Sequence, residues 1–266
     1  MTFAHAMRVL AGILKREFLR FIQQRARFFA ALVRPLIWLF VFAAGFRTTL
    51  GLSIIPPYQT YITYDVYIIP GLIGMILLFN GMQSSLSMVY DREMGSMRVL
   101  LTSPTPRWFL LLAKLFASTF VSIFQVYAFL IVASIIGIKF QPAGYLLLLP
   151  AVIMGGMMLG AAGLFLSSLI KQLENFAGIM NFVIFPAFFL SSALYPLWKM
   201  RESSVPLFNL CNYNPFTHVV ELIRFALYTT WNGKALLWVA IGFVIFAILA
   251  IMGYDPRKGF TNRRVA

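Results

Sequence analysis

Apolar runs about as long as a membrane is thick recur along the whole chain. A bilayer core of about 30 Å requires about 20 apolar residues for one helical span. Six runs of this kind occupy positions 29–46, 66–89, 109–137, 144–170, 175–194 and 235–253. Because these runs and their links use most of the 266 residues, they predict an all-α polytopic membrane protein with six transmembrane helices and no separate soluble domain.

The composition agrees with that class and excludes several others. Only 11% of the residues are charged, against about 25% in soluble domains. One cysteine, Cys211, and two distant histidines, His5 and His218, give neither a metal-ligand spacing nor converging groups for an intramembrane enzyme. The net charge of +14 is scattered between the apolar runs. We therefore expect no metal, no catalytic residue and no nucleic-acid partner.

The basic residues indicate the orientation instead. Fourteen of the 22 Lys and Arg residues lie in segments that six spans would place on one side, together with both ends of the chain, and six lie on the other side. The remaining two, Arg34 and Lys114, fall near the ends of spans. Cytoplasmic loops carry the excess of Lys and Arg, so we expect both termini in the cytoplasm.

The first 28 residues are too charged to cross a membrane. Their apolar side chains recur at helical spacing, with the cations mostly on the opposite side, which favours an amphipathic helix lying on the cytoplasmic leaflet. The alternative is a basic leader that only sets the topology. We divide the chain into this helix at 1–28, a transmembrane domain at 29–254 and a basic cytoplasmic tail at 255–266. The apolar stripe consists of Met7, Leu10, Leu14, Phe18 and Phe21.

A short helix is predicted between the fifth and sixth spans. Asn214 and Pro215 form an N-cap followed by proline at the first helical position. About fourteen residues follow, which span about 21 Å and are too few to cross a bilayer. We expect a re-entrant or interfacial helix on the outer side, in which Glu221 and Arg224 pair at i, i+3.

The longest polar interruption, from Asp91 to Trp108, lies between the second and third spans. The charge distribution places it in the cytoplasm. Charged residues alternate there with a short apolar patch and a Ser-Pro-Thr-Pro stop at 103–106. The pattern favours a short amphipathic helix on the membrane surface, and the alternative is an ordinary positively charged loop.

Three segments carry a resemblance to a known family. The run REMGSMRVLLTSP at 92–104 resembles the E-x-G-T-x-x-x-L-x-x-S-P loop of ABC-2 type transporter permeases, with Ser96 where threonine is usual. Positions 174–197 resemble the fifth-span signature of that family, and Asn214, Pro215, Glu221 and Arg224 resemble its segment before the last span. The run at 92–108 is also similar to permeases found with quinoprotein alcohol-oxidation systems.

The resemblance implies a bacterial inner-membrane exporter subunit that forms a homodimer and moves a hydrophobic or amphiphilic substrate. A separate nucleotide-binding subunit would bind ATP and Mg, and the absence of a G-x-x-x-x-G-K-[ST] motif from the sequence agrees with this. In the family, the loop between spans two and three is the coupling helix that docks on the ATPase. That role falls here on Asp91, Arg92, Glu93, Met94, Gly95, Ser96, Met97 and Arg98.

Polar positions inside the spans are candidates for the transport pathway. Asn80, Gln83, Ser84 and Ser87 share one face of the second span, and Ser118, Ser122 and Gln125 share a face of the third. The resemblance favours spans two and five as pathway walls, which adds Asn181. Such residues equally serve as contacts between helices. Gly155, Gly156, Gly160 and Gly163 indicate close helix packing.

Alternative functions and roles remain open at this point. The resemblance makes Asn214, Pro215, Glu221 and Arg224 an outer gate, and the alternative is an interfacial plug that stabilises the dimer. An ion-coupled secondary transporter would carry ionisable groups in mid-membrane and an internal repeat, neither of which the sequence shows. A membrane scaffold without transport activity is a further alternative.

Overall fold

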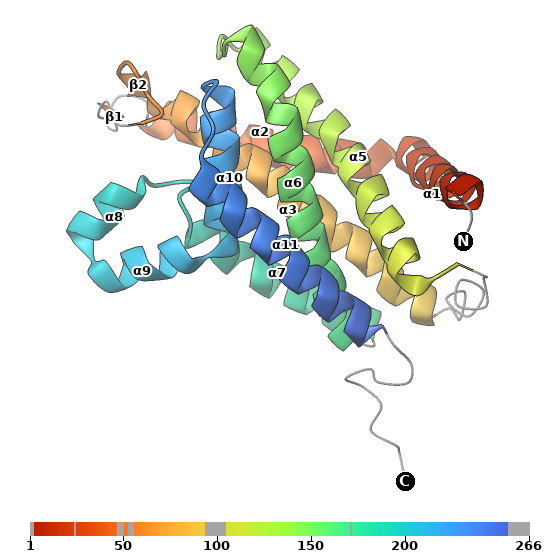
Figure 1. Cartoon of the computed structure of the whole chain (residues 1–266). Helices are drawn as coiled ribbons and strands as arrows, with labels where there is room; N and C mark the ends of the chain where they lie inside the picture. Colours follow the sequence, from red (N-terminus) through yellow and green to blue (C-terminus); the bar gives the residue numbers. More distant parts are fainter. Residues whose placement is uncertain are drawn as a thin grey trace.

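The computed structural model describes residues 3–23, 25–46, 51–52, 56–93, 105–170 and 172–254. These residues form ten helices and a two-stranded antiparallel ribbon (Figure 1). The elements are α1 Phe3–Gln23, α2 Arg25–Phe46, β1 Gly51–Leu52, β2 Ile62–Thr63, α3 Tyr64–Glu93, α5 Arg107–Ile135, α6 Pro142–Leu169, α7 Leu173–Phe189, α8 Leu197–Ser203, α9 Val205–Tyr213, α10 Pro215–Leu227 and α11 Gly233–Gly253.

Four of the helices are long and apolar enough to cross a membrane. They are α3, α5, α6 and α11, and they coincide with the predicted runs 66–89, 109–137, 144–170 and 235–253. The other two predicted spans fall on α2 and on the 17-residue α7. The chain is thus a multi-pass helical membrane protein, and membrane crossing by α2 and α7 stays a prediction.

The bundle is built around α3 and α6. The apolar window of α3 is 94% buried, against 17% for α11. Helix α3 contacts α2, α5, α6, α7 and α10, whereas α11 packs mainly on α6 and α10. An apolar helix with so little of its surface covered by its own chain leaves the rest available to lipid or to another chain, so we expect α11 at the periphery of the bundle.

Glycines in α6 let its neighbours approach closely, as the sequence predicts. A Cβ atom on Gly155 would lie 2.6 Å from a methyl of Val219 in α10, and one on Gly156 would lie 2.9 Å from a methyl of Thr119 in α5. On Gly163 it would lie 2.6 Å from the Ser85 hydroxyl in α3. These small residues therefore serve helix packing on three sides of α6.

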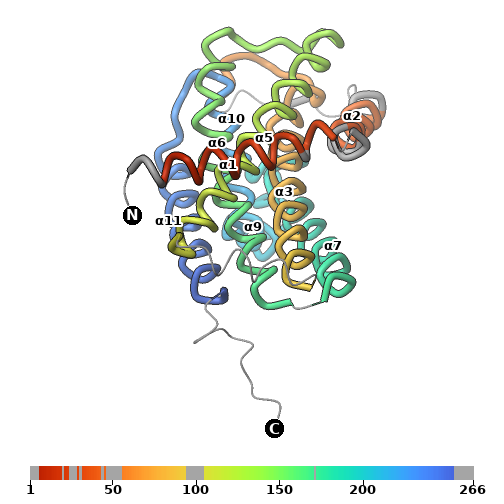
Figure 2. Tube along the Cα trace, turned by 90° about the vertical axis from the view of Figure 1, so that its right-hand side faces the viewer, coloured from red at the N-terminus to blue at the C-terminus, as the bar shows by residue number. Residues whose placement is uncertain are grey.

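Helix α1 crosses the bundle at a steep angle (Figure 2). It packs on α5, where the ring of Phe18 lies 6.4 Å from that of Phe120 and 5.9 Å from that of Phe124. Helix α1 ends at Gln23 and α2 begins at Arg25. Residues 25–28, which the sequence assigned to the amphipathic helix, therefore belong to α2.

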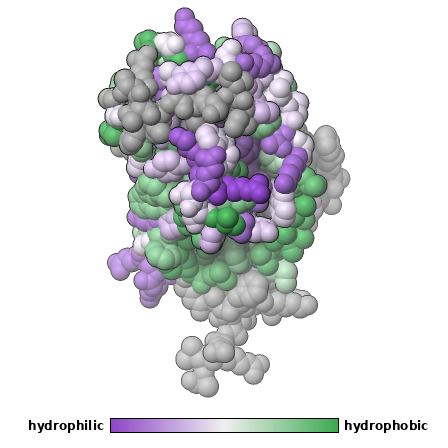
Figure 3. All heavy atoms as spheres, turned by 90° about the vertical axis from the view of Figure 1, so that its left-hand side faces the viewer, coloured by the Kyte–Doolittle hydropathy of each residue, from purple (hydrophilic) through white to green (hydrophobic). Residues whose placement is uncertain are grey.

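Two short helices, α8 and α9, lie between α7 and α10 and were not predicted. Each begins beside a proline: Pro196 is the N-cap residue of α8, and Pro206 lies in the first turn of α9. Exposed Lys199, Arg201 and Glu202 make α8 polar. Figure 3 shows this side of the molecule, where hydrophilic side chains gather next to a hydrophobic belt.

Candidate functional site

Polar and charged side chains concentrate at the two ends of the bundle and at one point between them. The α10 end comprises α10, the start of α3 and the end of α7. The α1 end comprises α1, the last turn of α3, the start of α5 and the ends of α6 and α11. Both ends contain residues that the sequence singled out.

At the α10 end, Asn214 joins two helices. Its side-chain oxygen accepts from the Phe216 backbone N–H at 3.0 Å, which confirms the predicted N-cap, with Pro215 as the first residue of α10. Its amide nitrogen donates to the carbonyls of Ala187 at 2.7 Å and Leu190 at 2.6 Å. The Asn214 side chain thus caps the start of α10 and links it by hydrogen bonds to the end of α7.

Arg224 points from α10 into the protein and is 4% exposed. It forms the predicted ion pair with Glu221 and donates to the Ser192 carbonyl at 2.7 Å. Its guanidinium lies 4.3 Å from the centre of the Tyr67 ring, and the Tyr67 hydroxyl donates to the same Ser192 carbonyl at 2.9 Å. Arg224 therefore connects α10, α3 and the turn after α7.

Two further tyrosines complete this cluster. The ring of Tyr58 meets that of Tyr228 edge-on at 5.0 Å, and burial raises the pKa of the Tyr58 phenol, which keeps it neutral. Within the described residues, the buried Tyr58 hydroxyl and Arg224 Nε have no hydrogen-bond partner. Neither tyrosine was predicted to belong to this site; the recurrence of tyrosine at every third position from 58 to 67 was a usable signal for Tyr58, and no such pattern marks Tyr228.

In the middle of the bundle, the predicted polar faces of α3 and α5 meet. The amide of Asn80 donates to the Ser122 hydroxyl at 3.0 Å and to the Gln125 side-chain oxygen. Gln83 and Ser84 are half-buried beside this network, whereas Asn181 is exposed on α7. The contacts of Asn80 favour a role between helices, and the structure does not bring Asn181 to it.

At the α1 end, the first residues of the predicted coupling segment form the last turn of α3. Asp91 is buried and lies 3.9 Å from the Lys114 ammonium, which also donates to the Ser87 hydroxyl at 2.7 Å. Arg92 donates to the carbonyls of Ser167 at 3.1 Å and Ile170 at 3.2 Å. Both residues therefore face the bundle.

The rest of the predicted coupling segment, from Glu93 to Arg98, does not contact the bundle in the same way or lies outside the described residues. Glu93 is exposed at the end of α3. Met94, Gly95, Ser96, Met97 and Arg98 lie outside the described residues, so the shape of the surface helix proposed there is not tested.

Arg34 lies deeper than its position near a predicted span end suggests. Its guanidinium is 3.7 Å from the centre of the Phe79 ring, and Phe79 is in the middle of α3. The long side chain extends from α2 along α3, because an aromatic face attracts a cation where water is scarce.

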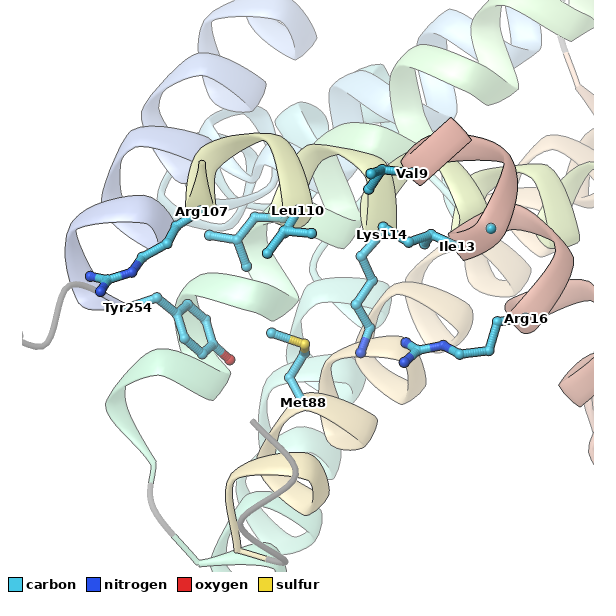
Figure 4. Close-up of a pocket in the computed structure, with 10 residues that line it drawn as sticks. Val9, Ile13, Arg16, Met88, Arg107, Leu110, Lys114 and Tyr254 are labelled. Atoms are coloured by element: carbon cyan, nitrogen blue, oxygen red, sulfur yellow. The ribbon is translucent and has the colours of Figure 1, made fainter. Parts of the chain in front are cut away.

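A cavity of about 290 Å³ opens at the α1 end between α1, α3, α5 and α11. Its walls are mainly apolar, and they carry the cations Arg16, Arg107 and Lys114. Figure 4 shows the Arg16 and Lys114 side chains ending side by side, with Arg107 at the opposite end of the cavity next to Tyr254. Among the described residues, no cluster of His, Cys, Asp and Glu could hold a metal ion.

Comparison with known proteins places this arrangement in a family. The family model described as ABC-2 type transporter matches residues 8–228, from α1 to the end of α10. A probable multidrug ABC transporter permease, YbhR of Escherichia coli K12, is 31% identical over 170 residues, which cover 63% of this chain and 45% of the relative. The chain thus matches less than half of that relative's length.

Two further relatives are matched over more of their length. The putative transport permease ycf38 of Cyanophora paradoxa is 25% identical over 80% of this chain and 72% of the relative. The protein of the same name from Porphyra purpurea is 27% identical over 84% and 75%. Because the family model covers most of the chain and the fold is a multi-pass helical bundle, the chain belongs to the ABC-2 type transporter family.

Proposed function

We propose that this chain is the membrane-spanning permease subunit of an ATP-binding cassette exporter. The match of the family model to residues 8–228 carries the proposal. The relatives are named as a multidrug ABC transporter permease and as transport permeases, and the sequence has no phosphate-binding loop of its own. A separate ATPase subunit would bind ATP and Mg and supply the energy.

The orientation follows from the charges. The α1 end would face the cytoplasm and the α10 end the outside of a bacterial inner membrane, because the excess of Lys and Arg lies in the segments joined to α1, to the 94–104 link and to the tail. Exposed charges on α8 would then lie on the outer surface. Both termini would be cytoplasmic.

The ATPase would dock at the link between α3 and α5. Two sets of contacts join α3 and α5 inside the bundle. Lys114 lies near Asp91 and donates to Ser87, and Asn80 donates to Gln125. A displacement at the link would therefore move both helices as one body. Since Asp91 and Arg92 face the bundle, we assign docking to Glu93 through Arg98 and a positioning role to Asp91 and Arg92.

A homodimer would complete the pathway. Exposed apolar side chains on α2 and α7, such as Phe40, Val41 and Phe182, would meet a second copy, and Asn181 on the exposed face of α7 would then line the path. The α10 end would close it on the outer side. A hydrophobic or amphiphilic substrate suits such walls. The resemblance to permeases of quinoprotein alcohol-oxidation systems stays a prediction.

The docking assignment is tested by purifying the permease with candidate ATPase subunits and measuring complex formation and ATP hydrolysis. We expect Glu93→Arg and Arg98→Glu each to weaken both. Glu174→Arg is the matched control, because Glu174 is exposed at the first turn of α7 outside the link. If both link variants fold and leave binding and hydrolysis unchanged, docking occurs elsewhere. Cysteine labelling of residues 91–107 from outside the cell would overturn the orientation.

A further inference from the structure

The cavity at the α1 end is small and mainly apolar. Its walls include Val9 and Ile13 from α1, Met88 from α3 and Leu110 and Leu111 from α5. Pockets for small molecules usually measure about 300–1,000 Å³, so about 290 Å³ accommodates part of a chain and not a large compact ligand. The wall suits hydrocarbon.

The charged side chains that line this cavity are all cationic. Arg16 and Lys114 lie together at one end in the close-up view (Figure 4), Arg107 lies at the other, and none of the described lining residues is acidic. Two acids stand behind them: Glu17 pairs with Arg16 at 3.0 Å, and Asp91 lies 3.9 Å from Lys114. The surface that faces the cavity is nevertheless cationic.

The position of the cavity along the helices also limits what it can bind. The cavity lies under the first half of α1, where α3 ends and α5 begins, so it is level with one end of the membrane-crossing helices. Further along α1, Phe18 closes the contact with α5 through Phe120 and Phe124. A space therefore lies between the first half of α1 and the bundle, at the end of the membrane-crossing helices where a lipid headgroup would lie.

We propose that this cavity binds one acyl chain of an anionic phospholipid from the surrounding leaflet. The phosphate lies at Lys114 and Arg16, and the chain lies against Met88, Leu110 and Leu111. Basic pockets between transmembrane helices suit anionic headgroups. A free anion would gain nothing from the apolar wall, and an uncharged lipid would gain nothing from the three cations that line the cavity. The bound lipid would fill the gap between α1 and the bundle.

The test uses the purified full-length protein in neutral detergent, titrated with phosphatidylglycerol or phosphatidylcholine. Native mass spectrometry counts the retained lipid, and thermal unfolding reports protection. We expect phosphatidylglycerol to be retained and to raise the unfolding midpoint. Removing one cation with Arg16→Gln should weaken its binding about fivefold. Lys15→Gln is the matched control, because Lys15 is exposed on the same helix and does not line the cavity.

A second variant tests whether occupying the cavity, without removing a cation, prevents lipid binding. Gly12 lines the cavity, and a Cβ built on it meets nothing within 4 Å. Gly12→Leu should therefore occupy the space, abolish lipid retention and leave the lipid-free protein at least as stable, since leucine favours a helix more than glycine.

Three outcomes would overturn the lipid site. They are equal retention of phosphatidylglycerol by all four proteins, equal retention of phosphatidylcholine by the wild type, and equal protection by inorganic phosphate. The measurement needs no ATPase, so its failure leaves the proposed function untouched.

Discussion

The cations at the two ends of the bundle have different surroundings. At the α10 end, Arg224 is matched by Glu221, by the Ser192 carbonyl and by the Tyr67 ring. At the α1 end, Arg16, Arg107 and Lys114 surround a cavity. Arg224 holds three elements together in the protein interior, whereas the α1-end cations line a cavity, with Lys114 also joining α3 and α5 through Asp91 and Ser87. The role of a cation near a membrane boundary therefore depends on the groups that surround it.

Packing follows the same contrast. A Cβ on Gly144 of α6 would lie 2.2 Å from the Leu227 carbonyl of α10, and one on Gly71 of α3 would lie 2.7 Å from the Ala193 carbonyl. On Gly12 of α1 it would meet nothing within 4 Å. At these two glycines the α10 end is packed backbone against backbone, whereas Gly12 at the α1 end borders a cavity.

The strongest test of this difference between the two ends is to remove the positive charge of Arg224 at the α10 end. Arg224→Met leaves Glu221 without its partner in the protein interior, and breaking a buried pair costs about 3–5 kcal/mol. Because the Glu221 side chain keeps 18% exposure, we expect a loss towards the lower end, seen as a lower unfolding midpoint in detergent.

The double variant Glu221→Gln with Arg224→Met serves as the control. It removes both charges, so it should be more stable than the single Arg224→Met variant. If the single variant unfolds like the wild type, Arg224 does not anchor this end. If the double variant is no better than the single one, the loss comes from packing and not from an unmatched charge.

The next prediction concerns close packing. Gly144→Ala places a methyl group against the Leu227 carbonyl and must push α6 away from α10, at a cost of about 1–3 kcal/mol. Gly178→Ala in α7 is the matched control, because a Cβ there meets nothing within 4 Å and alanine favours the helix by up to about 1 kcal/mol. The two unfolding midpoints should therefore shift in opposite directions, and a shift in the same direction would contradict the tight contact.

Much of the α10 end was predictable because its signals are local. The cap at Asn214 and Pro215 and the i, i+3 pair of Glu221 and Arg224 depend only on neighbours along one helix. Tyr67 and Ser192, which complete the site, are far from α10 in sequence. Their part depends on how α3, α7 and α10 pack, which periodicity does not specify.

Less of the α1 end was predictable from the sequence. Hydropathy located α3 and α5 well, but it gave no reason to place Asp91 and Arg92 inside the bundle, because charged residues after a span normally face water. Lys114, Ser167 and Ile170 provide the partners that hold them there. The cavity itself arises where the first half of α1 meets α5 and the ends of α3 and α11, an arrangement that no stretch of one helix encodes.

The smallest predicted effect lies between the two ends, at Asn80. Asn80→Ala removes the bonds to Ser122 and Gln125, and such interhelical bonds contribute about 0.6–2 kcal/mol. Ser84→Ala, on the same face and half-buried, is the control and should shift the unfolding midpoint less. A stability loss with unchanged transport by the reconstituted protein would assign Asn80 to helix packing. A change in transport at unchanged stability would instead make it part of the pathway, and the middle of the bundle would then belong functionally with the open α1 end and not with the closed α10 end.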